Sequence, residues 1–274
     1  EEISILNRFI NAKKHTSALP MKIWKNALGI DNDGYLNMHM GARRMLHGYG
    51  VRSVYCQHYS WTIITEELVK TLAEVIGSDS ACDLGCGTAY LSTLLQRDLI
   101  NVTAYDNRNG GYIHHKHNST IVIDKDYQTT DLSTYKYIIL SWPNYDEQVA
   151  AKLLDNLTEN QVLLYCGEDL GGCNADDEFF YKLQMQFEEI DEITQKLDNA
   201  SLSFSGIHDR WSAHRRVRGK DYVVCKGRKY RITGTKLNLV YVQTLNDNFQ
   251  PINYCSGSYD KADLLKRLWK SKWD

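Results

Sequence analysis

The ten residues from 81 to 90 constrain the fold of this chain more than any other segment. They read Ala-Cys-Asp-Leu-Gly-Cys-Gly-Thr-Ala-Tyr, and apolar Leu91, Leu94 and Leu95 follow at helical spacing. This order predicts a short buried strand, a glycine turn and the start of a helix. Glycine permits a positive φ and a close approach of backbone to ligand, and a helix N-terminus attracts polar ligand groups. The segment therefore predicts a ligand-binding strand–turn–helix unit.

Two features separate this turn from a dinucleotide-binding turn. The G-x-G-x-x-G pattern that starts at Gly85 and Gly87 would need a third glycine where Tyr90 stands. Asp83 precedes the first glycine by two positions, where a carboxylate would repel a pyrophosphate but suits an ammonium group. A second carboxylate, Asp106, ends the next predicted strand, where it can accept hydrogen bonds from both ribose hydroxyls. The alternative is a glycine turn in another kind of α/β protein, with Asp106 in a loop.

The pattern Asp83-x-Gly85-x-Gly87 resembles motif I of the class I S-adenosylmethionine (SAM) dependent methyltransferases. The usual motif ends in Gly-Thr-Gly, whereas Ala89 replaces the last glycine here. The resemblance implies that SAM is the cofactor. It also implies that Asp124 or Asp126, after the third predicted strand, accepts a hydrogen bond from the adenine amino group. The expected cofactor-binding residues are Asp83, Gly85, Cys86, Gly87, Thr88, Asp106, Asn107, Asp124, Tyr59 and Trp61.

Strands and helices alternate through the middle of the chain, which predicts an α/β fold. The expected architecture is a doubly wound, mostly parallel sheet, the class I methyltransferase fold, with N-terminal helical and C-terminal extensions. In such sheets the ligand lies beyond the carboxyl ends of the strands. The predicted strands are 80–84, 102–106, 120–123, 135–140 and 162–166, and the predicted helices are 66–76, 88–97, 146–156 and 176–187.

Three parts are expected along the chain. Residues 1–58 form an N-terminal helical lid, 59–231 the SAM-binding methyltransferase domain, and 232–274 a C-terminal extension. Segments 201–206 and 221–225 are expected to form the antiparallel hairpin that closes the sheet. The extension is expected to contain a strand at 237–242 and a helix at 261–272. This helix either offers a surface for RNA or a protein partner or caps the core.

The segment Ser141-Trp142-Pro143-Asn144-Tyr145 directly follows the fourth predicted strand. It resembles the Asn/Asp/Ser-Pro-Pro-Tyr motif of amino-group methyltransferases, in which polar groups hold the target amine and the aromatic ring stacks on it. Here Trp142 is inserted and Asn144 replaces the second proline. The alternative is a strand-ending turn with Trp142 in the core.

A looser resemblance covers about residues 59–180. Tyr59-Ser60-Trp61, the block 141–145, Gly167-Glu168 and Gly171-Gly172-Cys173 are similar to a poorly characterised methyltransferase-like family with Tyr-Ser-Trp, Trp-Pro-Pro-Tyr and Gly-Gly-Cys blocks. The family indicates fold and cofactor but no substrate. The catalytic residues expected from both resemblances are Ser141, Trp142, Pro143, Tyr145 and Glu168.

Methyl transfer from a sulfonium is an in-line displacement, so the protein mainly aligns donor and acceptor and excludes water. Tyr59 and Trp61 are candidates to cover the cofactor or to stack on a flat acceptor, or else to pack at a helix start. A hydroxyl acceptor needs a general base more than an amine does. The candidates for such a base are Glu168, Asp146 and His58, each of which also fits a solvated loop.

Charge is unevenly distributed, although the formal net charge is only −2. Residues 208–231 are rich in Lys and Arg with interleaved aromatics, which is typical of a surface that holds phosphates and stacks bases. Arg215, Arg216 and Arg218 are the expected substrate-binding residues, and RNA is the preferred acceptor. The alternatives are a solvated face that neutralises acidic residues 168–198, a small-molecule or protein side-chain acceptor, and a non-catalytic subunit that keeps the cofactor fold.

The seven cysteines show no C-x-x-C spacing, so neither a zinc ribbon nor a disulfide framework is expected. Reduced thiols predict an intracellular, cytoplasmic protein. No membrane segment is expected, because no apolar stretch approaches the roughly 18 residues that a spanning helix needs. His114, His115 and His117 lack a cysteine or carboxylate at ligand spacing, so no metal is expected.

Overall fold

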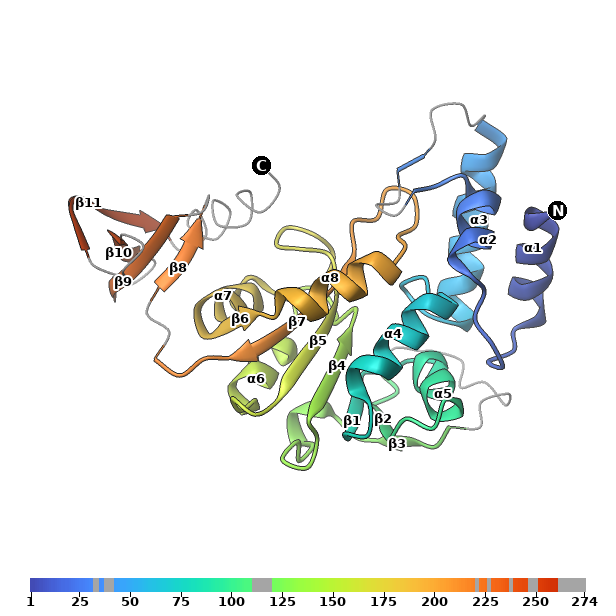
Figure 1. The fold of residues 1–274 in the computed structure, drawn as a ribbon, viewed down its shortest axis with the longest axis horizontal. Coiled ribbons are helices and arrows are strands. Elements are labelled where there is room, and N and C mark those ends of the chain that lie inside the picture. Colours follow the sequence, from blue (N-terminus) through green and yellow to red (C-terminus); the bar gives the residue numbers. More distant parts are fainter. Residues whose placement is uncertain are drawn as a thin grey trace. The chain divides into compact units, whose positions relative to one another are not determined.

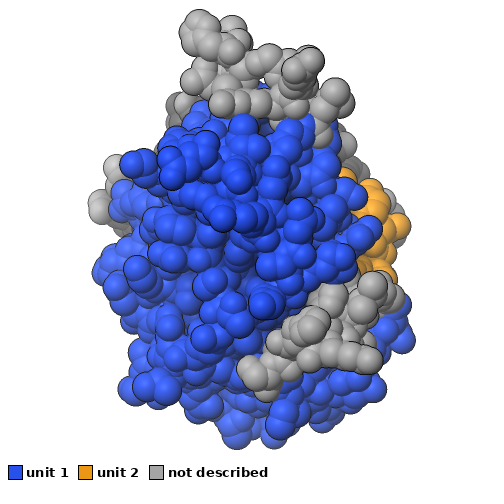
Figure 2. Space-filling view, turned by 90° about the vertical axis from the view of Figure 1, so that its right-hand side faces the viewer, with its two compact units in different colours: residues 1–143, 160–168, 189–215 blue, residues 144–159, 169–188, 216–274 orange. Residues whose placement is uncertain are grey.

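The computed structural model describes residues 1–31, 35–36, 42–109, 120–219, 222–225, 228–236, 239–245 and 251–260. The chain divides into two compact units, shown in Figure 2. Unit 1 contains Glu1–Pro143, Asn160–Glu168 and Glu189–Arg215, and unit 2 contains Asn144–Glu159, Asp169–Glu188 and Arg216–Asp274. The predicted helix 261–272 and the three histidines at 114, 115 and 117 lie outside the described residues.

A seven-stranded, mostly parallel sheet with flanking helices confirms the predicted fold class (Figure 1). Its strand order is β3-β2-β1-β4-β5-β7-β6. The order reverses between β1 and β4, so their carboxyl ends mark the topological switch point where ligands bind in such sheets. The strands are β1 Ala81–Leu84, β2 Val102–Asp106, β3 Val122–Asp124, β4 Tyr137–Ser141, β5 Val162–Gly167, β6 Phe187–Glu189 and β7 Arg210–Arg216.

Burial explains why the central strands form where the sequence predicts them. Every residue of β1 and of β5 is buried, as expected for parallel strands covered on both faces. The register aligns Asp83 of β1 with Ala104 of β2 and with Ile139 of β4. The carboxyl ends of these three strands therefore lie together at one edge of the sheet.

The helices of unit 1 form two groups. Helices α1, α2 and α3 pack against one another, and α4 packs against α5 and α8. Thr65 caps α4, because its side chain accepts a hydrogen bond from the Leu68 N–H at 3.0 Å and donates one to the Ala200 carbonyl at 2.9 Å. The bounds are α1 Glu2–Ala12, α2 Met21–Leu28, α3 Ala42–His58, α4 Glu66–Ile76, α5 Tyr90–Arg97 and α8 Asp191–Ala200.

Unit 2 contains two helices and a second sheet. Helices α6 (Val149–Asn156) and α7 (Asp177–Gln186) pack together. The second sheet is antiparallel with the order β11-β10-β9-β8. Its strands are β8 Tyr222–Cys225, β9 Arg228–Lys236, β10 Leu239–Leu245 and β11 Pro251–Asp260.

The closing part of the large sheet differs from the prediction. Residues 201–206 form no strand, and β8, which covers most of 221–225, belongs to the second sheet. The antiparallel strand beside β5 is β7, whose sequence Arg-Trp-Ser-Ala-His-Arg-Arg is too polar to read as a buried strand. The side chains of its Ser212 and His214 are buried, and the 2.8 Å hydrogen bond between them offsets the cost of burying polar groups. The boundary expected at residue 231 falls inside β9.

Candidate functional site

The turn between β1 and α5 has the tight geometry that its glycines predict. Gly85, Gly87 and Ala89 all adopt positive φ, at 67°, 54° and 55°. The Cys86 N–H donates to the Tyr105 carbonyl at 3.0 Å, and the Ala89 N–H donates to the Cys86 carbonyl at 2.8 Å. Ala89 thus takes the left-handed conformation of the missing glycine, at a cost of about 1–2 kcal/mol. The substitution leaves the turn intact.

Asp106 closes this turn from the end of β2. Its buried carboxylate accepts the Gly87 N–H at 2.8 Å through Oδ2 and the Arg108 N–H at 2.6 Å through Oδ1. Asp106 is therefore fixed beside the second glycine, where the sequence predicts a ribose-binding acid.

Asp83 is the second acid at this edge, and it is only 3% exposed. Its Oδ2 accepts a hydrogen bond from the Ser92 hydroxyl on α5 at 2.6 Å. Burial raises the pKa of Asp83 to about 6, the Ser92 bond opposes this rise, and the charge of Asp106 adds to it. No ion pair to Asp83 occurs within the described ranges, so its charge lacks a cation. A ligand ammonium group would supply one.

Two more turn residues have structural roles. Thr88 is buried, and its hydroxyl donates a short hydrogen bond to the carbonyl of Tyr59. Burial raises the pKa of the Cys86 thiol well above its usual range, so Cys86 is a neutral thiol. The turn is thereby joined to the segment that precedes α4.

The acids after β2 and β3 differ in their surroundings. Asn107 is exposed, and its Oδ1 accepts the Asn109 N–H at 3.1 Å. Asp126 caps the short 3-10 helix Tyr127–Thr129 by accepting the Gln128 N–H at 2.9 Å. Asp124 is exposed at the end of β3. Asp126 thus has a capping role, whereas the Asp124 carboxylate is exposed.

Tyr59 packs in the core, as in the second of its two expected roles. Its buried ring is not exposed to a ligand. The ring is buried and stacks on Tyr55 and on Phe9, each at 5.0 Å between centroids. Its hydroxyl donates to the Phe9 carbonyl at 2.7 Å. Trp61 differs, because it is 38% exposed.

Trp142 occupies a constrained position directly after β4. Its φ is 53°, a region that bulky residues rarely adopt. Its main-chain N–H donates to the Cys166 carbonyl at 2.7 Å, and its indole Nε1–H donates to Asp209 Oδ2 at 3.0 Å. The ring stacks on Trp61 with centroids 5.7 Å apart. Such strain persists where the surroundings enforce it, which is common at functional sites.

Three of the other predicted catalytic residues belong to unit 1 and one belongs to unit 2. Ser141 and Pro143 belong to unit 1, and the Ser141 hydroxyl hydrogen-bonds to the Cys166 thiol. Glu168, at the end of β5, accepts the His208 N–H at 3.2 Å through Oε1. Tyr145 belongs to unit 2 and is 66% exposed.

The two further candidate bases have no geometry that marks them as catalytic. Asp146 is exposed in unit 2, and His58 is buried at the end of α3. The His58 carbonyl lies 2.6 Å from His15 Nε2.

The predicted substrate-binding arginines have different surroundings. Arg216 is engaged within unit 2, where its guanidinium donates to the Leu154 carbonyl at 2.9 Å and to Gln186 Oε1 at 2.8 Å. Arg218 is 90% exposed and pairs with Glu159 at 2.8 Å. Arg215 is exposed at the end of β7. Arg216 is thus a packing residue, while the other two face solvent.

Three residues of this region were missed by sequence reasoning. Asp209 and Arg52 flank the Trp61–Trp142 pair, and Ser92 holds Asp83. Only Ser92 had a local indication, since it lies on the predicted helix after the glycine turn. The contact between Trp142 and Asp209 joins residues 67 positions apart and leaves no local pattern.

The described residues form neither a metal site nor a membrane-spanning helix. They contain no group of three or more His, Cys, Asp or Glu side chains that could hold a metal ion. None of their helices combines the length and apolar character needed to cross a membrane.

Known proteins resemble this chain only in three-dimensional structure. No protein-family model and no curated protein matches it. A TehB-like SAM-dependent methyltransferase from Corynebacterium glutamicum shares 12% identity, with a TM-score of 0.42 and coverage of 63% of this chain and 100% of that chain. Magnesium protoporphyrin IX methyltransferase from Synechocystis, with bound SAM, shares 14% identity, with a TM-score of 0.32 and coverage of 79% and 98%. N-methyltransferase NodS from Bradyrhizobium japonicum shares 11% identity, with a TM-score of 0.35 and coverage of 55% and 92%. Likeness at this level assigns no activity to the chain.

Proposed function

We propose that this protein is a SAM-dependent methyltransferase. The observation that carries the proposal is the pair of buried acids around one left-handed glycine turn at the switch point of the sheet. Asp106 is fixed to the Gly87 N–H, and Asp83 lies two residues before Gly85 without a counter-charge among the described residues. A ligand with an ammonium group and a ribose matches both acids.

The residues present fit SAM in chemical type. Asp83 would hold the ammonium group, Asp106 the ribose hydroxyls and Asp124 the adenine amino group. Gly85 leaves room for backbone approach, since a Cβ at this position would meet only Tyr127 at 3.8 Å. When bound, SAM supplies a methyl group on a positively charged sulfur.

The chain itself would position the acceptor and exclude water. Ser141 and Trp142 stand at the carboxyl end of β4, next to the switch point, where an acceptor would meet the methyl donor. The strained Trp142 backbone and its three fixed contacts make this wall of the site rigid. An amine acceptor carries its own lone pair, so it needs no strong base at this position.

Calorimetric titration of SAM into wild type and Asp106→Asn tests the cofactor assignment. We expect SAM affinity to fall about 10- to 100-fold, because hydrogen bonds to a charged group are worth roughly 1.5–3 kcal/mol. Asp98→Asn, an exposed acid after α5, is the matched control and should bind SAM as wild type does. Asp106→Ala is less informative, because it removes the acceptors of both backbone N–H groups, whereas asparagine keeps one of them.

Two results would count against the proposal. Equal SAM affinity in wild type and Asp106→Asn would reject the ribose-binding role. Absence of SAM binding to wild type would favour a non-catalytic subunit that keeps only the fold.

RNA is a second candidate for the acceptor class, supported by the exposed Arg215 and Arg218 within a basic, aromatic-rich stretch. The double variant Arg215→Glu/Arg218→Glu should weaken RNA binding and flatten its salt dependence, since each lost phosphate contact lowers the slope by about one. Filter binding at several salt concentrations measures both. Salt-insensitive or absent RNA binding in wild type would favour a small-molecule or protein acceptor.

A further inference from the structure

Two buried polar atoms in unit 1 face the Trp61–Trp142 pair without a hydrogen-bond partner among the described residues. They are Oδ1 of Asp209 and Nε of Arg52. Asp209 is only 7% exposed. Buried polar groups nearly always find a partner in protein, water or ligand, so two such atoms near one aromatic pair indicate a missing partner.

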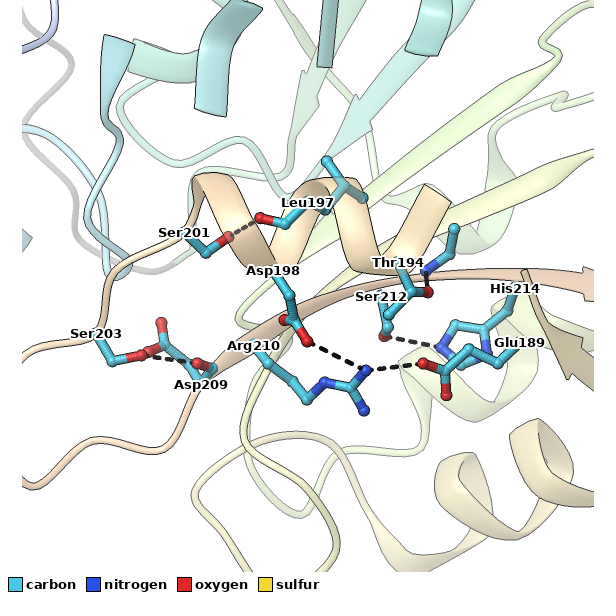
Figure 3. Close-up of polar contacts among 11 residues, drawn as sticks. Glu189, Thr194, Leu197, Asp198, Ser201, Ser203, Asp209, Arg210, Ser212 and His214 are labelled. Atoms are coloured by element: carbon cyan, nitrogen blue, oxygen red, sulfur yellow. Dashed lines mark hydrogen bonds and ion pairs between the residues drawn. The ribbon is translucent and has the colours of Figure 1, made fainter. Parts of the chain in front are cut away.

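The charge of Asp209 is not neutralised by the adjacent arginine. The Arg210 guanidinium lies 2.7 Å from Glu189 and 3.7 Å from Asp198, and Figure 3 shows both acids converging on it. The Asp209 carboxylate instead accepts the Trp142 indole N–H on Oδ2. Burial raises the pKa of Asp209, and the hydrogen bond from Trp142 opposes this rise. The Ser203 hydroxyl donates to the Asp209 main-chain carbonyl at 2.8 Å, so Oδ1 of the carboxylate has no hydrogen-bond partner among the described residues.

Arg52 approaches the same aromatic pair from α3. Its Cζ lies 5.8 Å from the centre of the Trp61 ring, and no ion pair to Arg52 occurs in the described part of the chain. Arg52 also borders a surface hollow of unit 1, together with Tyr49, Phe204 and Ser205.

The charges of Arg52 and Asp209 both influence the thiol of Cys56. Cys56 follows Arg52 by one helical turn, and its pKa is raised to about 11, first by burial. The Arg52 charge lowers this pKa and the Asp209 charge raises it. The neutral thiol neutralises neither of these two charges.

We propose that Asp209 and Arg52 form a subsite that binds the amide edge of a small, flat methyl acceptor beside Trp61 and Trp142. This rests on the proposed methyltransferase function. An amide presents a carbonyl that accepts from the guanidinium and an adjacent N–H that donates to the carboxylate. A carboxylate ligand would be repelled by Asp209, and a cationic amidine would be repelled by Arg52. Of these three groups, only the amide satisfies both open atoms, and the indole rings supply a flat wall.

Three probes of equal shape test the subsite: benzamide, benzoate and benzamidine. Titrations followed by the indole N–H resonances of 15N-labelled wild-type protein should show benzamide binding about tenfold more tightly than either ion, or roughly 1.4 kcal/mol. In Asp209→Asn the repulsion of benzoate is removed, so the benzamide-to-benzoate preference should fall about tenfold. The asparagine side chain of this variant would still accept the Trp142 N–H, so the fold is kept. Asp198→Asn, a half-exposed acid nearby, should leave the preference unchanged.

Each contrary result overturns the subsite. Preferred benzoate binding would leave Arg52 alone in contact, and preferred benzamidine binding would leave Asp209 alone. Failure of all three probes would mean that only water joins the two atoms. A parallel SAM titration separates the two proposals, since SAM binding without benzamide binding rejects the subsite alone, and benzamide binding without SAM binding rejects the cofactor role alone.

Discussion

The Asp83 carboxyl makes the stability of the protein depend on pH in an unusual direction. Its folded-state pKa is about 6, above the unfolded value near 3.9, so the folded state retains the proton longer. Below about pH 4 the group is neutral in both states and contributes nothing. As pH rises from 4 to 6, the Asp83 carboxyl ionises in the unfolded state while the folded state still keeps its proton. The free energy of unfolding should therefore fall by roughly 3 kcal/mol between pH 4 and pH 6.

Urea unfolding of wild type and Asp83→Asn from pH 4 to 7 isolates this effect. The difference in unfolding free energy should grow in favour of Asp83→Asn as pH rises, because asparagine keeps an acceptor for Ser92 without the charge. Other carboxyls titrate equally in both proteins and cancel. A pH-independent difference would show that Asp83 is ionised normally.

At this scale, the residues that the sequence identified are those set by local geometry. Gly85 and Gly87 need a positive φ, and Asp83 and Asp106 end adjacent parallel strands, so spacing alone brings them together. Asp209 escaped notice because its partner Trp142 comes from a distant strand. The position of the Tyr59 ring depended on packing that a Tyr-Ser-Trp pattern does not encode.

At the scale of elements, the start of α4 depends on Thr65. One fully buried hydroxyl accepts the Leu68 N–H and donates to the Ala200 carbonyl after α8. Thr65→Val keeps the shape but leaves both backbone groups unpartnered. We expect a loss of about 2–3 kcal/mol in unfolding free energy, measured by urea denaturation.

Thr65→Ser is the control, because serine keeps both hydrogen bonds and loses only a methyl group. It should cost about 1 kcal/mol or less. Equal losses in the two variants would show that the methyl group, rather than the hydroxyl, stabilises this helix start.

Among the elements, the sequence predicted those with continuous apolar runs. Buried strands such as β1 and β5 are recognisable because both faces are covered. The polar β7 and the short β6 lack that pattern. β7 pairs with the sheet edge that β5 offers, and β6 is the neighbour of β7. Helix α8 was missed for a related reason, because its buried face is narrow.

At the scale of the whole molecule, the predicted parts and the compact units do not coincide. Each compact unit contains segments that are far apart in the sequence. Unit 1, for example, contains residues 1–143, 160–168 and 189–215. The length of the chain and the alternation of its elements predicted a C-terminal extension after the methyltransferase domain. They did not predict that a second sheet begins at Tyr222, because the sequences of short polar strands resemble those of loops.

The hydroxyl of Thr88 ties the glycine turn to the carbonyl of Tyr59, and Tyr59 is wedged between Phe9 and Tyr55. Whatever displaces that turn must also pull on the aromatic core beneath the first three helices. If SAM binds at the sheet edge as proposed, its turn and the amino-terminal third of unit 1 belong to one continuous set of contacts.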